Sequence, residues 1–391
     1  MLKQDWFRVA LGMYVVAFGA NLFAPMILAY QRFTGLTALH TTFLFGFYAV
    51  GLTVALFIGG PLSDIYGRRT IIRPALLCTA AGSLLFLSGY SGNFTVLLTA
   101  RLIVGVAVGL TMAAGAAWMK ELSPSVAVGA QRSSVALTLG FATAPLIAGL
   151  LSQFLPLPTI APYVVHLALT VLVIPLAWMA PASPPRALSR ALPQDSSKPA
   201  RRAWLPRCLA TPKFIPVLAY APWVFGSVTT AFGFLPLLVK DHTSFPIAVA
   251  GTLAFLTMGT GALVQRIARS WSAVVGLFAA AVGMGLAFVI AVNREHAWVL
   301  WLLPVAAVVL GFSYGVNMVN GLAETQALAP AAELGAATGV FYTLTYVGFF
   351  APFLLSFVGP RMGYGATFAF GMVAAFLAMV LVTFSYRGNR G

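Results

Sequence analysis

Long apolar stretches recur along almost the whole chain. Each covers about 20 residues or more, which as an α-helix is enough to cross a hydrocarbon core of about 30 Å. Strands of an outer-membrane barrel would alternate polar and apolar residues, whereas these stretches are apolar on every face. The pattern therefore predicts an all-α membrane protein. We expect twelve transmembrane helices, over residues 7–30, 40–59, 71–90, 94–118, 133–154, 160–180, 214–239, 247–265, 271–292, 297–321, 336–358 and 365–386.

The composition supports this class. Hydrophobic residues make up 60% of the 391 residues and charged residues only 8%, whereas a water-soluble domain is normally about 25% charged. The net charge of +15 in a soluble protein would suggest nucleic-acid binding. In a membrane protein such cations set the topology and meet anionic lipid headgroups. We therefore expect membrane lipids, and no nucleic acid, as partners.

The positions of the cations predict the orientation. If the N-terminus is cytoplasmic, eighteen of the 23 Lys and Arg residues lie in cytoplasmic segments, four lie outside and Arg101 lies in the membrane. Short cytoplasmic loops retain Lys and Arg. This bias predicts a multi-pass protein of the plasma membrane, or cell inner membrane, with both termini in the cytoplasm.

One connection is much longer than the others. Residues 181–213 are rich in Pro, Ser and Arg and divide the chain into two six-helix halves, residues 1–180 and 214–391. We interpret the connection as a flexible basic linker on the lipid surface, with a regulatory role as the alternative.

The two halves resemble each other, which indicates duplicated bundles with the functional site between them. Matching positions at offsets of 201 to 207 are Gly60 and Gly261, Arg68 and Arg269, Glu121 and Glu324, and Pro145 and Pro352.

The loop after the second predicted helix contains a closely spaced sequence motif. Its residues are Gly60, Leu62, Asp64, Gly67, Arg68 and Arg69. With the twelve helices, this motif resembles the major facilitator superfamily over essentially the whole chain. The resemblance implies two pseudo-symmetric six-helix bundles and a loop that latches the outward-open state. Ile65 departs from the family pattern, which often has an arginine there. A tight turn with topology-setting arginines is the alternative.

Two glutamates are expected to join this gate. Glu121 and Glu324 end the fourth and tenth predicted helices. We expect gate residues near basic neighbours such as Lys120 and Arg132, and proton acceptors as the alternative.

The fourth helix carries a cation at membrane depth. A charge there costs about 2.5 to 3.5 kcal/mol on insertion scales, so Arg101 is a candidate functional residue. Gly105 and Gly109 follow at four-residue intervals, on the same helix face, and allow another backbone to approach closely. The segment resembles a family motif associated with proton transfer, although Val104 replaces a frequent glutamine. A structural arginine, bound by carbonyls, hydroxyls and water, is the alternative.

The fifth helix contains Gly140, Pro145 and Gly149. This segment is similar to the antiporter motif of the drug-exporting branch of the family, which implies outward transport. Small residues with a proline also allow tight packing and a bend, so packing alone is the alternative.

Aromatic and amide side chains in the central helices predict a substrate cavity. Aromatic walls with a few polar groups suit a small amphipathic molecule, while interhelical packing is the alternative for each aromatic residue. The candidate substrate-binding residues are Tyr14, Asn21, Tyr48, Arg101, Trp223, Tyr314, Asn317, Tyr342 and Tyr346.

The sequence thus favours a secondary transporter that works by alternating access. We expect a monomer that exports a small amphipathic organic molecule, which is neutral, zwitterionic or anionic, and that couples this export to protons. Uptake or exchange of an organic anion and lipid flipping are the alternatives. No metal-ligand cluster, phosphate loop or nucleophile with a base is apparent, so we expect no enzyme activity, cofactor or metal.

Overall fold

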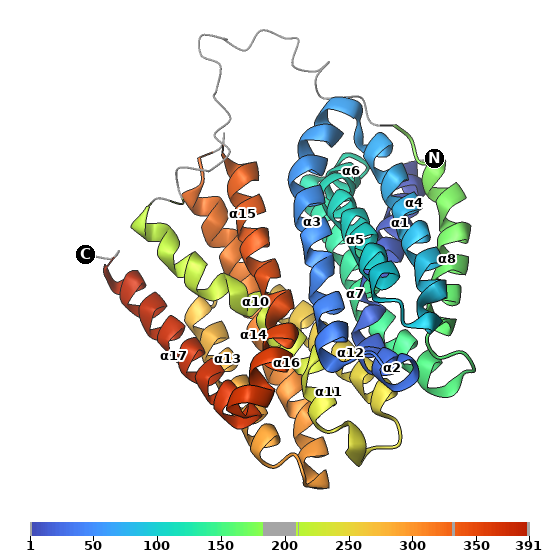
Figure 1. The fold of residues 1–391 in the computed structure, drawn as a ribbon. Helices are drawn as coiled ribbons and strands as arrows, with labels where there is room; N and C mark the ends of the chain where they lie inside the picture. Colours follow the sequence, from blue (N-terminus) through green and yellow to red (C-terminus); the bar gives the residue numbers. More distant parts are fainter. Residues whose placement is uncertain (1, 183–208, 210, 331–332, 389–391) are drawn as a thin grey trace. The chain divides into compact units, whose positions relative to one another are not determined.

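The computed structural model describes residues 2–182, 209, 211–330 and 333–388, and these residues are mainly helical (Figure 1). The α-helices of the first part of the chain are α1 (Leu2–Asn21), α2 (Phe23–Thr34), α3 (Ala38–Tyr66), α4 (Arg68–Leu87), α5 (Phe94–Leu110), α6 (Ala116–Glu121), α7 (Val126–Phe154) and α8 (Ala161–Trp178). The later ones are α10 (Ile215–Gly233), α11 (Leu235–Leu238), α12 (Pro246–Ile267), α13 (Ala273–Val292), α14 (Leu302–Leu328), α15 (Leu334–Val347), α16 (Ala351–Met362) and α17 (Tyr364–Gly388).

Twelve segments of the described chain are long and apolar enough to cross a membrane. Their ends lie within seven residues of those of the twelve expected spans, so the all-α membrane fold is confirmed. Four spans are interrupted helices: α1 with α2, α5 with α6, α10 with α11, and α15 with α16. Such interruptions leave main-chain groups free to bind side chains.

The chain divides into two compact units. Unit 1 comprises Met1–Leu36 and Phe47–Ala200, and unit 2 comprises Thr37–Gly46 and Arg201–Gly391. The first residues of α3 therefore group with unit 2, where Thr42 donates a hydrogen bond to the Ser356 hydroxyl on α16 at 3.1 Å. Most of the predicted linker lies outside the described residues.

Close helix packing in unit 1 depends on glycine. A Cβ atom at Gly105 of α5 would lie 2.1 Å from the Tyr48 carbonyl oxygen on α3, and one at Gly109 would lie 2.3 Å from that of Leu52. On α7, a Cβ at Gly140 would lie 2.6 Å from the Tyr14 carbonyl oxygen on α1. These helix backbones approach so closely because no side chain separates them.

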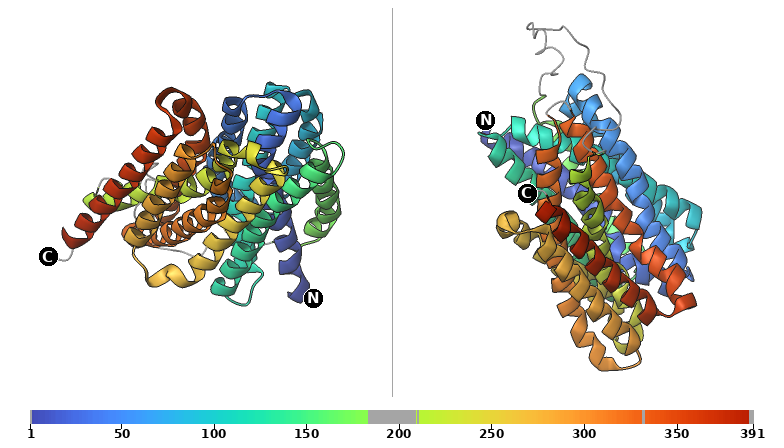
Figure 2. Two further views of the ribbon diagram at one scale, coloured as in Figure 1. Left: turned by 90° about the horizontal axis from the view of Figure 1, so that it is seen from below. Right: turned by 90° about the vertical axis from the view of Figure 1, so that its left-hand side faces the viewer.

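Close helix packing in unit 2 also depends on glycine. Gly311 and Gly315 of α14 pack against the backbone of α12, where added Cβ atoms would lie 2.3 Å and 2.6 Å from the carbonyl oxygens of Thr257 and Gly261. Pairs of glycines spaced four residues apart therefore join neighbouring helices in both units. The long helices α13 and α17 also lie side by side (Figures 1 and 2).

A π-helical turn interrupts the fourth span. It covers Thr111–Gly115, between α5 and α6. Such a turn contains one residue more than an α-helical turn and often occurs near functional sites. It separates the segment that carries Arg101 from the segment that ends at Glu121.

Candidate functional site

Arg101 lies inside unit 1 with only 1% of its surface exposed. Its Nη1 donates a hydrogen bond to the Ala20 carbonyl oxygen at 3.1 Å. Its guanidinium also lies over two aromatic rings, with its central carbon 4.5 Å from the centroid of Tyr48 and 4.6 Å from that of Phe23. Ring faces attract cations, most strongly where water is excluded. The first and second spans thus hold the charge of the fourth span in one place.

The break between α1 and α2 helps to form this site. Ala20 precedes the break and Phe23 begins α2. An interrupted helix has a carbonyl that no longer needs to bond within its own helix, and such a group can accept from a side chain. Phe23 was not expected from the sequence, because a phenylalanine in an apolar span looks the same whether it faces lipid or a cation.

The other candidates of unit 1 face α7. The Tyr14 hydroxyl is 3.1 Å from the Thr143 hydroxyl, and the Asn21 Nδ2 donates to the Phe141 carbonyl oxygen at 2.6 Å. Both contacts join the first span to the helix that carries Gly140, Pro145 and Gly149. Tyr48 is the candidate that the structure brings to Arg101.

Unit 2 brings three of its candidates into one aromatic cluster. Tyr346 stacks on Phe225 with ring centroids 4.7 Å apart, and Tyr314 lies 5.6 Å from the same ring. Tyr342 lies 6.4 Å from Tyr346. Phe225 of α10 is therefore the centre of the cluster, although its sequence context does not distinguish it from neighbouring apolar residues.

Two further candidates of unit 2 lie apart from this cluster. Asn317 is fully buried beside Gly276 of α13, where an added Cβ would lie 2.3 Å from the Asn317 Oδ1. Its Nδ2 donates to the Ser313 hydroxyl at 3.3 Å. Trp223 packs instead against apolar residues of α13 and α17.

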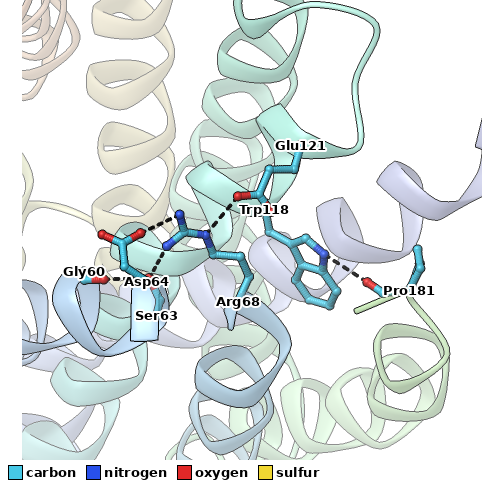
Figure 3. A network of polar contacts seen from close by, with 7 residues as sticks. All are labelled: Gly60, Ser63, Asp64, Arg68, Trp118, Glu121 and Pro181. Atoms are coloured by element: carbon cyan, nitrogen blue, oxygen red, sulfur yellow. Dashed lines mark hydrogen bonds and ion pairs between the residues drawn. The ribbon is translucent and has the colours of Figure 1, made fainter. Parts of the chain in front are cut away.

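Arg68 is the centre of an ion-pair network at one end of unit 1 (Figure 3). Its Nη2 lies 2.7 Å from the Asp64 Oδ1, and its Nε lies 3.2 Å from the Glu121 Oε1. Its Nη1 donates to the Ser63 hydroxyl, which donates in turn to the Gly60 carbonyl oxygen at 2.8 Å. The guanidinium thereby joins the ends of α3 and α6, and Ser63 is a member that sequence reasoning missed.

A glycine turn positions Arg68. Gly67 separates α3 from α4 and has a φ of 89°, a conformation in which a Cβ is strained. Its N–H donates to the Ser63 carbonyl oxygen at 3.1 Å. This turn places the first residue of α4 back over the last turn of α3.

Basic residues near the network have further partners of their own. Arg132 donates to the Ser123 hydroxyl at 3.1 Å, and its guanidinium lies 3.9 Å from the ring centroid of Trp6. Arg69 donates to the Trp178 carbonyl oxygen at the end of α8, at 2.7 Å. Trp118, beside Glu121 on α6, donates to the Pro181 carbonyl oxygen at 3.2 Å (Figure 3).

Glu324 has a different environment from Glu121. Its carboxyl group accepts hydrogen bonds from the hydroxyls of Tyr220 on α10, at 2.9 Å, and Tyr386 on α17. Among the described side chains, no cation forms an ion pair with it. The two matching glutamates are therefore held by unlike partners, an arginine in one unit and tyrosines in the other.

Replacing Arg68 with glutamine should destabilise the protein by about 1 to 3 kcal/mol, because two carboxylates lose a charged donor. We expect a lower melting temperature in detergent. The control is Arg8→Gln, which removes a local ion pair with Asp5 at 3.0 Å and should cost below about 1 kcal/mol. Equal melting temperatures of the two variants would show that the network contributes no special stability.

Twelve apolar spans in two compact units define a multi-pass membrane protein. Residues 9–351 match the Major Facilitator Superfamily. The chain belongs to this family, and the family and fold support a secondary transporter that works by alternating access.

Relatives and solved structures agree with this assignment. The chain is 26% identical over 154 residues to the quinolone resistance protein NorA of Staphylococcus aureus, and 25% identical over 154 residues to an uncharacterised MFS-type transporter of Methanocaldococcus jannaschii. Each match covers 39% of this chain and 39% of the relative, so the chain spans well under half the length of these relatives.

The fold also resembles solved transporters. A D-xylose-proton symporter superposes with a TM-score of 0.74 at 14% identity, over 96% of both chains. A POT family transporter in complex with 5-aminolevulinic acid has a TM-score of 0.79 at 12% identity, over 98% of this chain and 96% of that one. At such identities the likeness concerns the fold alone.

Proposed function

We propose that the protein exports a small amphipathic organic molecule, neutral, zwitterionic or anionic, in exchange for protons. It acts as a monomeric transporter, without enzyme activity, in the plasma membrane with both termini in the cytoplasm. The observation that carries the proposal is the buried guanidinium of Arg101, held by aromatic faces and a carbonyl oxygen.

The surroundings of Arg101 suit this substrate class. The rings of Tyr48 and Phe23 cover the guanidinium, so a ligand reaches the cation only after a ring has moved. When a ring moves aside, its apolar face and the guanidinium become accessible together. An amphipathic molecule with a hydrogen-bond acceptor can bind to both. A cationic drug is disfavoured because the fixed positive charge would repel it.

The direction of transport is supported by similarity. NorA is a quinolone resistance protein, and the segment with Gly140, Pro145 and Gly149 resembles the motif of the exporting branch. A quinolone, which carries both a carboxylate and an amine, is therefore a suitable probe.

Exchange of an organic anion is the second candidate, and the permanent charge of Arg101 favours it. Here the guanidinium would pair with a carboxylate or phosphate of the substrate in a two-point contact. This mechanism needs a counter-substrate on the opposite side and no proton gradient.

Purified protein in proteoliposomes separates these functions. With a quinolone as probe, we expect accumulation when a pH gradient is imposed, and its loss when a protonophore removes the gradient. Empty liposomes under the same gradient are the control. Transport that persists without a gradient, and requires an aromatic carboxylate on the other side, would replace proton-coupled export by anion exchange.

A further inference from the structure

Two arginines on the first turns of α4 converge on one acceptor. Arg69 and Arg73 both donate through Nη2 to the Trp178 carbonyl oxygen, at 2.7 Å and 3.3 Å. The guanidinium of Arg73 also lies 4.7 Å from the ring centroid of Trp178. Two positive charges are thus neighbours at the last residue of α8.

The protein supplies few acceptors for these cations. Each guanidinium carries about five N–H donors, yet one carbonyl oxygen accepts from both. The Nε of each arginine is shielded and has no hydrogen-bond partner, and neither forms an ion pair within the described chain. Both residues remain half-buried, so part of each side chain faces outward. The pair therefore suits an anion that accepts several hydrogen bonds.

An apolar surface continues from the arginine pair. On α4, Leu77 and Leu84 follow Arg73 at spacings that keep them on one side of the helix, and each is more than half exposed. Helix α8 packs beside α4 (Figure 1). Its Leu172 and Leu176 are exposed as well. A phosphate at the arginines would therefore have room for hydrocarbon chains along both helices.

Trp178 fits the same ligand. Tryptophan favours the headgroup level of a bilayer, where its ring meets both apolar and polar groups. Trp178 ends α8, where its carbonyl oxygen accepts from both arginines and its ring lies under the Arg73 guanidinium. Cationic donors, an interfacial tryptophan and an apolar surface match the headgroup, glycerol and acyl parts of a phospholipid in order.

We propose that Arg69, Arg73 and Trp178 form a binding site for the phosphate of an anionic phospholipid, whose acyl chains lie along α4 and α8. The site is separate from Arg101 and does not depend on the transported substrate. It assigns a lipid ligand to Arg69, which belongs to the sequence motif at the junction of α3 and α4, and to Arg73 in the next turn of α4.

Native mass spectrometry of the full-length protein can test this site. The protein is released from mild detergent with equal amounts of phosphatidylglycerol and phosphatidylcholine that carry the same acyl chains. Wild type should retain phosphatidylglycerol preferentially. In the Arg69→Gln/Arg73→Gln double variant, the ratio of bound phosphatidylglycerol to phosphatidylcholine should fall about tenfold. The two cations attract the net negative charge of phosphatidylglycerol, whereas the choline of phosphatidylcholine already balances its phosphate. The ratio is measured on folded protein, so a lower yield does not affect it.

The matched control removes two cations elsewhere. Arg32 lies over Phe33 and Arg361 over Phe357, and the Arg32→Gln/Arg361→Gln variant should keep the ratio within about twofold. Arg73→Lys, which keeps the charge, should retain part of the preference. An equal loss in both double variants, or no loss in either, would overturn the site. Displacement of the lipid by inorganic phosphate would also overturn it, by showing that the site takes a free anion.

Discussion

Transport should fall by about tenfold to a hundredfold when Arg101 is replaced by glutamine. The substitution removes a buried charge and leaves the Ala20 carbonyl oxygen and two aromatic rings without their cation, a loss of roughly 1.5 to 3 kcal/mol. Arg101→Lys keeps the charge but loses the planar contact with the rings, so it should retain an intermediate rate. The measurement is the initial transport rate in proteoliposomes, per amount of folded protein.

A control is needed because a buried substitution also affects folding. Arg361→Gln removes a cation whose partners belong to its own helix, and it should leave the rate close to wild type. Turnover by Arg101→Gln at the wild-type rate would exclude Arg101 from substrate contact and from proton transfer. Arg101 would then be a structural residue.

The second large effect is expected at Gly105. Replacement with leucine should prevent stable folding, because even the first side-chain carbon would lie 2.1 Å from the Tyr48 carbonyl oxygen. Overpacking against flexible side chains costs about 1 to 3 kcal/mol, and rigid backbone atoms should raise the cost above that range. The measurement is the yield of monodisperse protein and its melting temperature in detergent.

Gly259 provides the comparison for this experiment. It lies in α12, and a Cβ atom there would have nothing within 4 Å. Gly259→Ala should therefore be tolerated, and Gly105→Ala should not. Equal yields and melting temperatures for these two alanine variants would contradict the close packing of α3 and α5.

The spans could be predicted from the sequence because each is a continuous apolar segment. Hydrophobic length is a property of one segment and needs no knowledge of its neighbours. The same is true of the Gly67 turn, since Asp64, Gly67 and Arg68 lie within five consecutive residues. The spans and the turn therefore occur in the structure where the sequence predicts them.

The partners of the site residues were less predictable. Helical spacing places Tyr314 and Asn317 on similar faces, yet Tyr314 packs on Phe225 whereas Asn317 faces Gly276. Spacing gives the direction of a side chain from its own helix, but the residue that it meets depends on how neighbouring helices cross. Glu324 shows the same limit, because its tyrosine partners come from α10 and α17, far away in the sequence.

The π-helical turn at Thr111–Gly115 affects how the fourth span is compared with the same span of other chains. It inserts a residue between the Arg101 segment and Glu121, and each residue of an α-helix turns the chain by about 100°. A helical wheel drawn through the whole span therefore misplaces Glu121 by that angle relative to Arg101. A chain without the insertion needs a one-residue gap here when the two sequences are aligned.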